Sequence, residues 1–68
     1  MGWVAVDKDG QEVKLIKKPI RSNKGYWFVK IGVWGEEHYG DDLDSGTIEK
    51  LIGIKLTWED EPVELKEE

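Results

Sequence analysis

The side chains that could do chemistry in this 68-residue chain are one histidine, a few hydroxyls and many carboxylates. His38 lies among acidic residues, and carboxylate oxygens are the ligands that a hard cation such as calcium prefers. A calcium-binding loop also needs a glutamate at its twelfth position, and counting from Asp42 that position holds Gly53. The pattern therefore indicates a solvated acidic loop, and we expect neither a metal nor another cofactor.

Catalysis by a nucleophile needs a hydroxyl or thiol beside a base, and the sequence marks no such pair. The chain has no cysteine, and no serine or threonine is clearly partnered with the single imidazole. Carboxylates could act as acid and base, but on so acidic a surface their presence says little. A single domain of 68 residues also leaves little room for a deep cleft. We therefore expect a protein that is not an enzyme.

Aromatic and basic residues are interleaved between positions 14 and 34. Stacking rings amid positive charge are the means by which many proteins bind single-stranded nucleic acid. The whole chain, however, carries a net charge of −5, which repels phosphate. A single-stranded nucleic-acid-binding module is therefore the alternative hypothesis, behind protein binding.

Three of these aromatic residues are the candidate binding residues: Tyr26, Phe28 and Trp34. They share one face of a predicted strand whose other face serves the core, and one short helix covers only part of a sheet. Exposed aromatic rings rimmed by charge are typical of protein contact sites. We therefore expect a non-catalytic interaction module that binds a protein partner or a second copy of itself. The alternative is a curved sheet that buries all three rings.

Charge is unevenly distributed along the chain. Residues 1–34 hold seven basic and three acidic residues, whereas residues 35–68 hold three basic and twelve acidic residues. Both halves could simply solvate one domain, or the acidic half could imitate a nucleic acid in the binding site of another protein. No signal peptide or membrane span is visible and cysteine is absent, so we expect a cytoplasmic protein without membrane contacts.

The first predicted element is a hairpin that spans residues 3–16. Asp7 at the first turn position and Gly10 at the fourth favour a three-residue loop, which places Trp3 opposite Leu15. A two-residue loop would shift this pairing by one residue. We favour the first register, because aspartate suits the leading position of the turn.

Residues 26–34 form the longest predicted strand. Both of its faces carry bulky side chains, which favours a central position in the sheet. A polar link over residues 17–25 precedes it, and a turn at residues 35–37 leads to a short fourth strand over residues 38–43.

A short helix is predicted near residues 46–52. Ser45 or Gly46 can occupy its N-cap, and a glycine follows its last turn. Leu51 lies in the apolar stripe of this helix, so we expect Leu51 to anchor the helix on the sheet. Apolar and polar residues then alternate over residues 54–58, which predicts a strand, and residues 63–65 predict a short edge strand.

These elements predict an α+β fold. It is a small twisted, mainly antiparallel sheet of four to five short strands with one short helix, or the same strands curled into a small open barrel. Residues 1–65 form a single domain, and residues 66–68 form a frayed acidic tail. The predicted core draws on every element and consists of Trp3, Ala5, Val13, Leu15, Trp27, Val29, Ile31, Ile48, Leu51, Ile52, Leu56 and Trp58.

Three stretches carry a resemblance to a known group of proteins: GTIEKLIGIKLTWEDEPVEL over residues 46–65, the opening GWVAVDKDGQE, and the link Lys18-Pro19. Together they resemble short uncharacterised proteins that bacteriophages and prophages of gut bacteria encode. The resemblance covers most of the chain. It implies a small intracellular accessory factor that acts on a host or phage protein, and it implies no particular functional residues.

Overall fold

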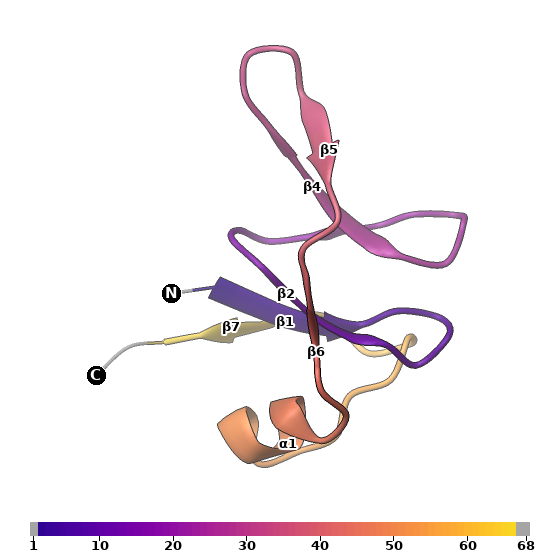
Figure 1. The fold of residues 1–68 in the computed structure, drawn as a ribbon, viewed down its shortest axis with the longest axis vertical. Helices are drawn as coiled ribbons and strands as arrows, with labels where there is room; N and C mark the ends of the chain where they lie inside the picture. Colours follow the sequence, from indigo (N-terminus) through magenta and orange to yellow (C-terminus); the bar gives the residue numbers. More distant parts are fainter. Residues whose placement is uncertain (1, 67–68) are drawn as a thin grey trace.

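The computed structural model describes residues 2–66. Within this range the chain forms seven short strands and one helix (Figure 1). In chain order these are β1 (Gly2–Val6), β2 (Glu12–Leu15), β3 (Ile20–Arg21), β4 (Trp27–Ile31), β5 (Glu36–His38), β6 (Asp41–Leu43), α1 (Thr47–Ile52) and β7 (Val63–Leu65). Of the expected frayed tail, residues 67 and 68 lie outside the described range.

The strands form two sheets, one of four strands in the order β6-β2-β1-β7 and one of three in the order β3-β4-β5. All of the paired strands are antiparallel. The three-stranded sheet lies on one side of the larger sheet and α1 on the other (Figure 1). The predicted α+β fold with mainly antiparallel strands and one short helix is therefore confirmed, although the strands divide between two sheets and do not close into a barrel.

The hairpin of β1 and β2 has the predicted register, with Trp3 opposite Leu15. Its turn is closed by the Gly10 amide, which donates to the Asp7 carbonyl at 2.9 Å. Gly10 has φ 94°, a left-handed conformation that glycine adopts without strain. The turn chemistry read from the sequence thus sets which side chains of β1 face each layer.

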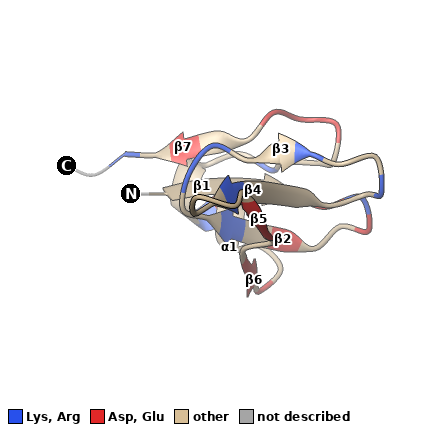
Figure 2. Ribbon diagram, turned by 90° about the horizontal axis from the view of Figure 1, so that it is seen from above, with Lys and Arg blue, Asp and Glu red and all other residues tan. Residues whose placement is uncertain are grey.

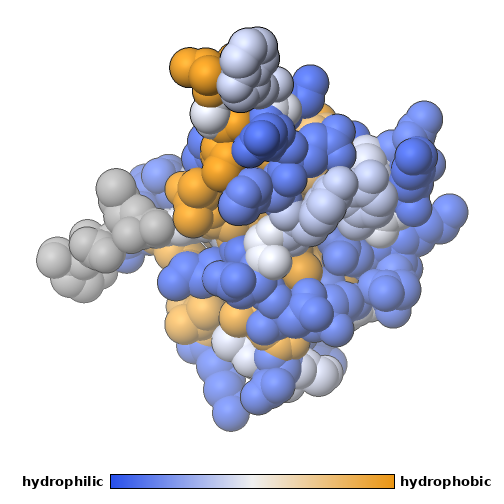
Figure 3. Space-filling view, turned by 45° about the horizontal axis from the view of Figure 1, so that its top comes forward, coloured by the Kyte–Doolittle hydropathy of each residue, from blue (hydrophilic) through white to orange (hydrophobic). Residues whose placement is uncertain are grey.

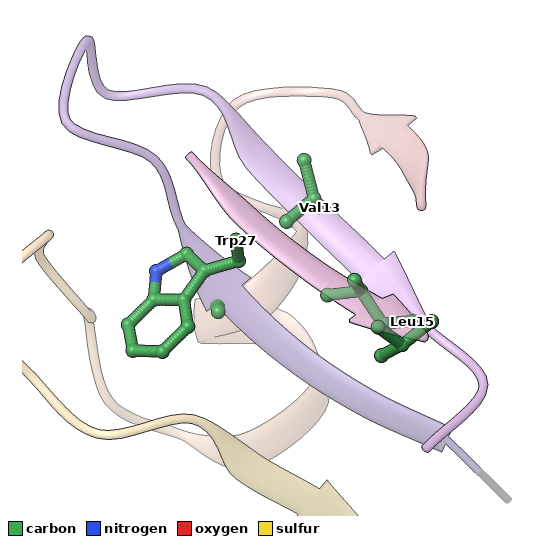
Figure 4. Close-up of a cluster of buried hydrophobic side chains, with 5 residues drawn as sticks. Val13, Leu15 and Trp27 are labelled. Atoms are coloured by element: carbon green, nitrogen blue, oxygen red, sulfur yellow. The ribbon is translucent and has the colours of Figure 1, made fainter. Parts of the chain in front are cut away.

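The hydrophobic core has two parts because β1 lies between the two outer layers. One cluster unites the four-stranded and three-stranded sheets, and Figure 4 shows Val13 and Leu15 of β2 beside Trp27 of β4. The second cluster joins the four-stranded sheet to α1 and contains Val4, Val6 and Ile48. Val4 and Val6 were absent from the predicted core, yet both are buried, because the helix covers their face of β1.

A residue distant in sequence caps the helix. Gly46 occupies the N-cap with φ 90° and has no side chain to offer. Instead, the Glu12 carboxylate of β2 accepts hydrogen bonds from the Gly46 and Ile48 amides, each at 2.8 Å. Glu12 therefore satisfies two of the free amides of the first turn and ties α1 to the sheet. Gly53 ends the helix as predicted, with φ 82° and its amide bonded to the Glu49 carbonyl.

Leu51 is not the anchor of the helix, because 53% of its surface is exposed. The buried residue is Ile48, and Ile52 is half-buried beside it. Helix residues are about 100° apart, so Leu51 lies about 60° to one side of Ile48 and Ile52 about 40° to the other. The sheet contacts the Ile52 side of the helix. Of the predicted apolar stripe, therefore, Ile48 and Ile52 pack against the sheet and Leu51 does not.

The predicted strand over residues 54–58 does not form. Leu56 and Trp58 are half-buried as its alternation suggested, but they pack against different clusters of the core. The Thr57 amide donates to the Asp60 carboxylate at 2.7 Å, so its partner is a local side chain and not a neighbouring strand. The predicted edge strand does form as β7, which pairs with β1.

The long strand predicted over residues 26–34 is shorter and turns earlier. β4 ends at Ile31, and the turn spans Gly32 to Gly35. The expected single strand over residues 38–43 is divided between β5 and β6, which belong to different sheets. At Gly40, where the chain crosses between them, a Cβ atom would lie 2.6 Å from the Lys14 carbonyl oxygen, so only glycine allows this close approach.

Candidate functional site

The outer face of the three-stranded sheet carries an aromatic cluster. The Tyr26 ring meets the Phe28 ring with centroids 6.3 Å apart and the Tyr39 ring at 5.0 Å, both edge to face. Ile20 of β3 pairs with Phe28 on the same face. These neighbours leave only 9% of Phe28 exposed, so Phe28 belongs to the packed interior and not to an open contact surface.

Trp34 lies apart from this cluster, at the tip of the hairpin formed by β4 and β5. Trp34 is 87% exposed and its neighbour Val33 is 93% exposed. The turn is bracketed by Gly32 and Gly35, whose φ angles are 78° and 66°, and the Gly35 amide donates to the Gly32 carbonyl at 3.2 Å. Figure 3 shows hydrophobic surface at this projecting end of the molecule. Of the three predicted binding residues, the structure therefore brings Tyr26 and Phe28 together and separates Trp34 from both.

The two strands that hold the tip carry opposite charges. Lys30 of β4 lies opposite Glu37 of β5, and Ile31 lies opposite Glu36. Figure 2 shows the basic position on β4 and the acidic β5 next to one another. Tyr39 donates from its hydroxyl to Glu37 Oε1 at 3.0 Å, and this hydrogen bond raises the pKa of Tyr39. An approaching partner thus meets an apolar tip with a cation on one strand and carboxylates on the other.

An open groove of about 560 Å³ lies elsewhere on the molecule, between the turn that joins β1 and β2 and the loop of residues 56–59. Its apolar lining comes from Val6, Leu56 and Trp58. Lys8 lines it from the turn and Glu59 from the loop. The groove combines an apolar surface with one exposed charge of each sign on its two walls.

Arg21 holds the loop that forms one wall of this groove. Its guanidinium carbon lies 4.7 Å from the centroid of the Trp27 ring and 5.1 Å from that of Trp58, distances at which a cation is attracted to an aromatic face. Its Nη2 donates to the carbonyl of Trp58 at 2.7 Å and to that of Asp60 at 3.3 Å. The loop is therefore fixed against β3 and β4 before any ligand binds.

Asp7 lies at the turn end of the groove. Its Oδ1 accepts a hydrogen bond from the Trp27 amide at 3.0 Å. Burial raises the pKa of Asp7, the hydrogen bond from Trp27 opposes this, and the nearby carboxylates of Asp9 and Asp42 raise it further. Asp7 thus joins the first hairpin to β4, and its surroundings in the fold disfavour the charged form of its carboxyl group.

Metal and membrane sites receive no support from the described part of the chain. Among residues 2–66 no group of three or more histidine, cysteine or acidic side chains is placed to hold a metal ion. His38 is exposed on β5, opposite Val29. No helix within that range has the length and apolar character needed to cross a bilayer.

Sequence reasoning missed both Val33 and the groove. Val33 was expected on the core face of a long strand, whereas the chain has already turned at Gly32. The two glycines that bracket Val33 and Trp34 were the available signal, since glycines around two residues favour a turn. The groove had no such signal, because its walls come from residues about fifty positions apart in the chain.

Comparison with known proteins gives no further guide to this site. No family model, no curated protein and no solved structure matches the chain. The resemblance to short phage proteins therefore stays a prediction.

Proposed function

We propose that this protein is a non-catalytic interaction module that binds a protein partner through the tip of the β4–β5 hairpin. The observation that carries the proposal is the nearly complete exposure of two adjacent apolar side chains, Val33 and Trp34. They sit on a part of the molecule that projects from its body (Figures 1 and 3). Covering a side chain of this kind releases about 1.5–3 kcal/mol, and tryptophan is enriched among the residues that dominate protein interfaces.

The tip is also well prepared for binding. Gly32 and Gly35 supply the positive φ angles of the turn, and three residue pairs join β4 to β5 behind it. A rigid element loses less conformational entropy on binding than a flexible loop. The exposed indole is therefore presented at low entropic cost.

The structure gives less support to single-stranded nucleic acid as the ligand. A platform for stacking bases would draw on Tyr26, Phe28 and Trp34, but Phe28 is covered and Trp34 lies away from the other two rings. The strand beside the tip carries Glu36 and Glu37, which repel phosphate. The proposed partner is accordingly a protein.

An affinity-capture experiment with matched variants tests the proposal. The full chain and its Trp34→Ala and Leu51→Ala variants are immobilised and exposed to lysate from the native cell. Leu51→Ala is the control, because Leu51 is also an exposed large apolar side chain but lies on α1, at the other end of the molecule (Figure 1). We expect the captured protein to be lost with Trp34→Ala and retained with Leu51→Ala. Equal capture by both variants would mean that the tip is not the contact element.

A further inference from the structure

We propose that the partner of this hairpin tip is a second copy of the chain, with Val33 and Trp34 of one molecule seated in the groove between the β1–β2 turn and residues 56–59 of the next. The inference rests on the proposed function, because it names the partner of the same tip. Tip and groove lie apart in one molecule, the tip on the projecting hairpin and the groove beside the β1–β2 turn in the middle layer (Figure 1). The contact therefore joins one copy to another.

The groove fits the tip in size and in chemical character. Its volume of about 560 Å³ lies in the range of pockets that hold small organic ligands, about 300–1,000 Å³. The lining side chains of Val6, Leu56 and Trp58 offer apolar contacts and an aromatic ring to an incoming indole. The tip contributes the apolar side chains of Val33 and Trp34, which are both exposed to solvent in the monomer.

The charges around the two surfaces are complementary. Lys8 is exposed on the turn wall of the groove and Glu59 on the loop wall. The hairpin carries Lys30 on β4 and Glu36 on β5, beside the tip. When the tip enters with β5 toward Lys8 and β4 toward Glu59, each strand meets the opposite charge. Charge of this kind selects one orientation more than it adds affinity.

Asp7 also lines the turn wall, and its carboxylate is engaged within the fold. It accepts the hydrogen bond from the Trp27 amide, and it is only partly exposed. Lys8, by contrast, is exposed beside it. The accessible charge of the turn wall is therefore the cation of Lys8.

The loop wall of the groove is formed before binding. Its turn is closed by the Asp60 amide, which donates to the Thr57 carbonyl at 3.0 Å, and by the Asp60 carboxylate, which accepts from the Thr57 amide. Arg21 then holds the Trp58 and Asp60 carbonyls. Neither the groove nor the tip has to fold in order to meet its partner, so the contact area is available for affinity.

Such a contact is heterologous, because the two copies use different surfaces: the tip of one and the groove of the other. This determines how the copies assemble. Each bound molecule keeps one free tip or one free groove, so the chain of copies grows until it closes into a ring or extends as a filament. A single hairpin tip buries less surface than a standard interface, and weak association in the range of about 10 μM to 1 mM is expected.

Sedimentation equilibrium of the full chain over that concentration range tests the inference. We expect the weight-average mass of the wild type to rise to at least about twice the monomer mass at the highest concentration, about 1 mM. Trp34→Ala removes the indole ring of the tip. Glu59→Trp introduces an indole ring at an exposed position in the wall of the groove, where it fills the groove. We expect each variant alone to remain monomeric. Leu51→Ala is again the control and is expected to associate as the wild type does.

Mixing the two defective variants gives the sharpest result. Trp34→Ala keeps an intact groove and Glu59→Trp keeps an intact tip, so an equimolar mixture is expected to form 1:1 dimers that grow no further. A second pair tests the orientation: Lys8→Glu and Glu36→Lys are each expected to weaken association at least about threefold, and the double variant is expected to recover it. Near-ultraviolet circular dichroism of each variant establishes that it is folded.

The results separate this inference from the function on which it rests. A wild type that stays monomeric to 1 mM, or a mixture that forms no dimers, overturns the second copy as the partner. If Trp34→Ala still abolishes capture of another protein in that case, the interaction module stands with a different partner. If Trp34→Ala affects neither self-association nor capture, both proposals fail.

Discussion

At the scale of single residues, Asp7 combines two opposing contributions. Its side chain joins the first hairpin to β4 through the Trp27 amide, yet burial and two neighbouring carboxylates disfavour its charge. The pKa of Asp7 is therefore raised in the folded state above its ordinary value of 3.8. A proton binds the folded state more tightly than the unfolded one, so this group lowers stability as pH rises through the window from 3.8 to the folded pKa.

Asp7→Asn is the test of this assignment. Asparagine keeps an acceptor for the Trp27 amide and removes the charge. We expect the variant to melt at a higher temperature than the wild type at pH 7, and the difference to disappear below pH 3.8, where the carboxyl is neutral in both states of the wild type. Thermal melts at a series of pH values measure this. A variant less stable than the wild type at pH 7 would show that the hydrogen bond needs the full carboxylate.

At the scale of elements, the hairpin of β1 and β2 could be predicted because its signals are local. Asp7 and Gly10 fix the turn, and the turn fixes the register. The segment of residues 54–58 shows the limit of such reasoning. Its alternation correctly predicted that Leu56 and Trp58 face inward, but alternation does not show whether a neighbouring strand is free to pair.

The candidate site was predicted only in part, for the same reason. Trp34 was correctly expected to be exposed, but it was placed on one face of a long strand, whereas it lies in the turn that follows β4. Tyr39 could not be recognised as the edge-to-face partner of Tyr26, since it follows β5 and the residue pattern of β4 gives no sign of it. The groove depends on how the loop of residues 56–59 packs against the turn, which is a property of the tertiary structure.

The helix supplies a prediction at this scale. Ile48→Ala is expected to lower the free energy of unfolding by about 2–5 kcal/mol, because Ile48 is buried between α1 and β1. Leu51→Ala is expected to change it by less than about 0.5 kcal/mol, because most of Leu51 is in water. Urea unfolding of both variants provides the comparison. Equal losses would place Leu51 in the core after all.

At the scale of the whole molecule, Arg21 connects parts of the chain that no strand pairing joins. It belongs to β3 in the smaller sheet and bonds to residues 58 and 60, just before β7 enters the larger sheet. Its guanidinium also contacts the rings of Trp27 and Trp58, whose centroids are 5.5 Å apart. One exposed side chain thus holds the C-terminal loop onto the β3–β4 hairpin.

Arg21→Ala is expected to lower the free energy of unfolding by about 1–2 kcal/mol through loss of the hydrogen bonds and the ring contacts. Arg21→Lys is expected to restore less than half of this, because an ammonium lacks the planar guanidinium that lies over the Trp27 and Trp58 rings. Urea unfolding followed by tryptophan fluorescence measures this loss. Lys24→Ala, a nearby exposed cation, serves as the control, and a loss no greater than that of Lys24→Ala would contradict the role of Arg21.

The position of β1 has a consequence for the order in which the protein can be made. β1 is a central strand, paired with β2 on one side and with β7 on the other, where Gly2 meets Leu65. During synthesis β1 leaves the ribosome long before β7. For most of translation β1 can therefore pair only with β2, and its other edge has no neighbouring strand. Amide exchange on ribosome-bound chains should therefore show the β1–β2 hairpin protected first, with protection of the second edge of β1 delayed until residue 65 has emerged.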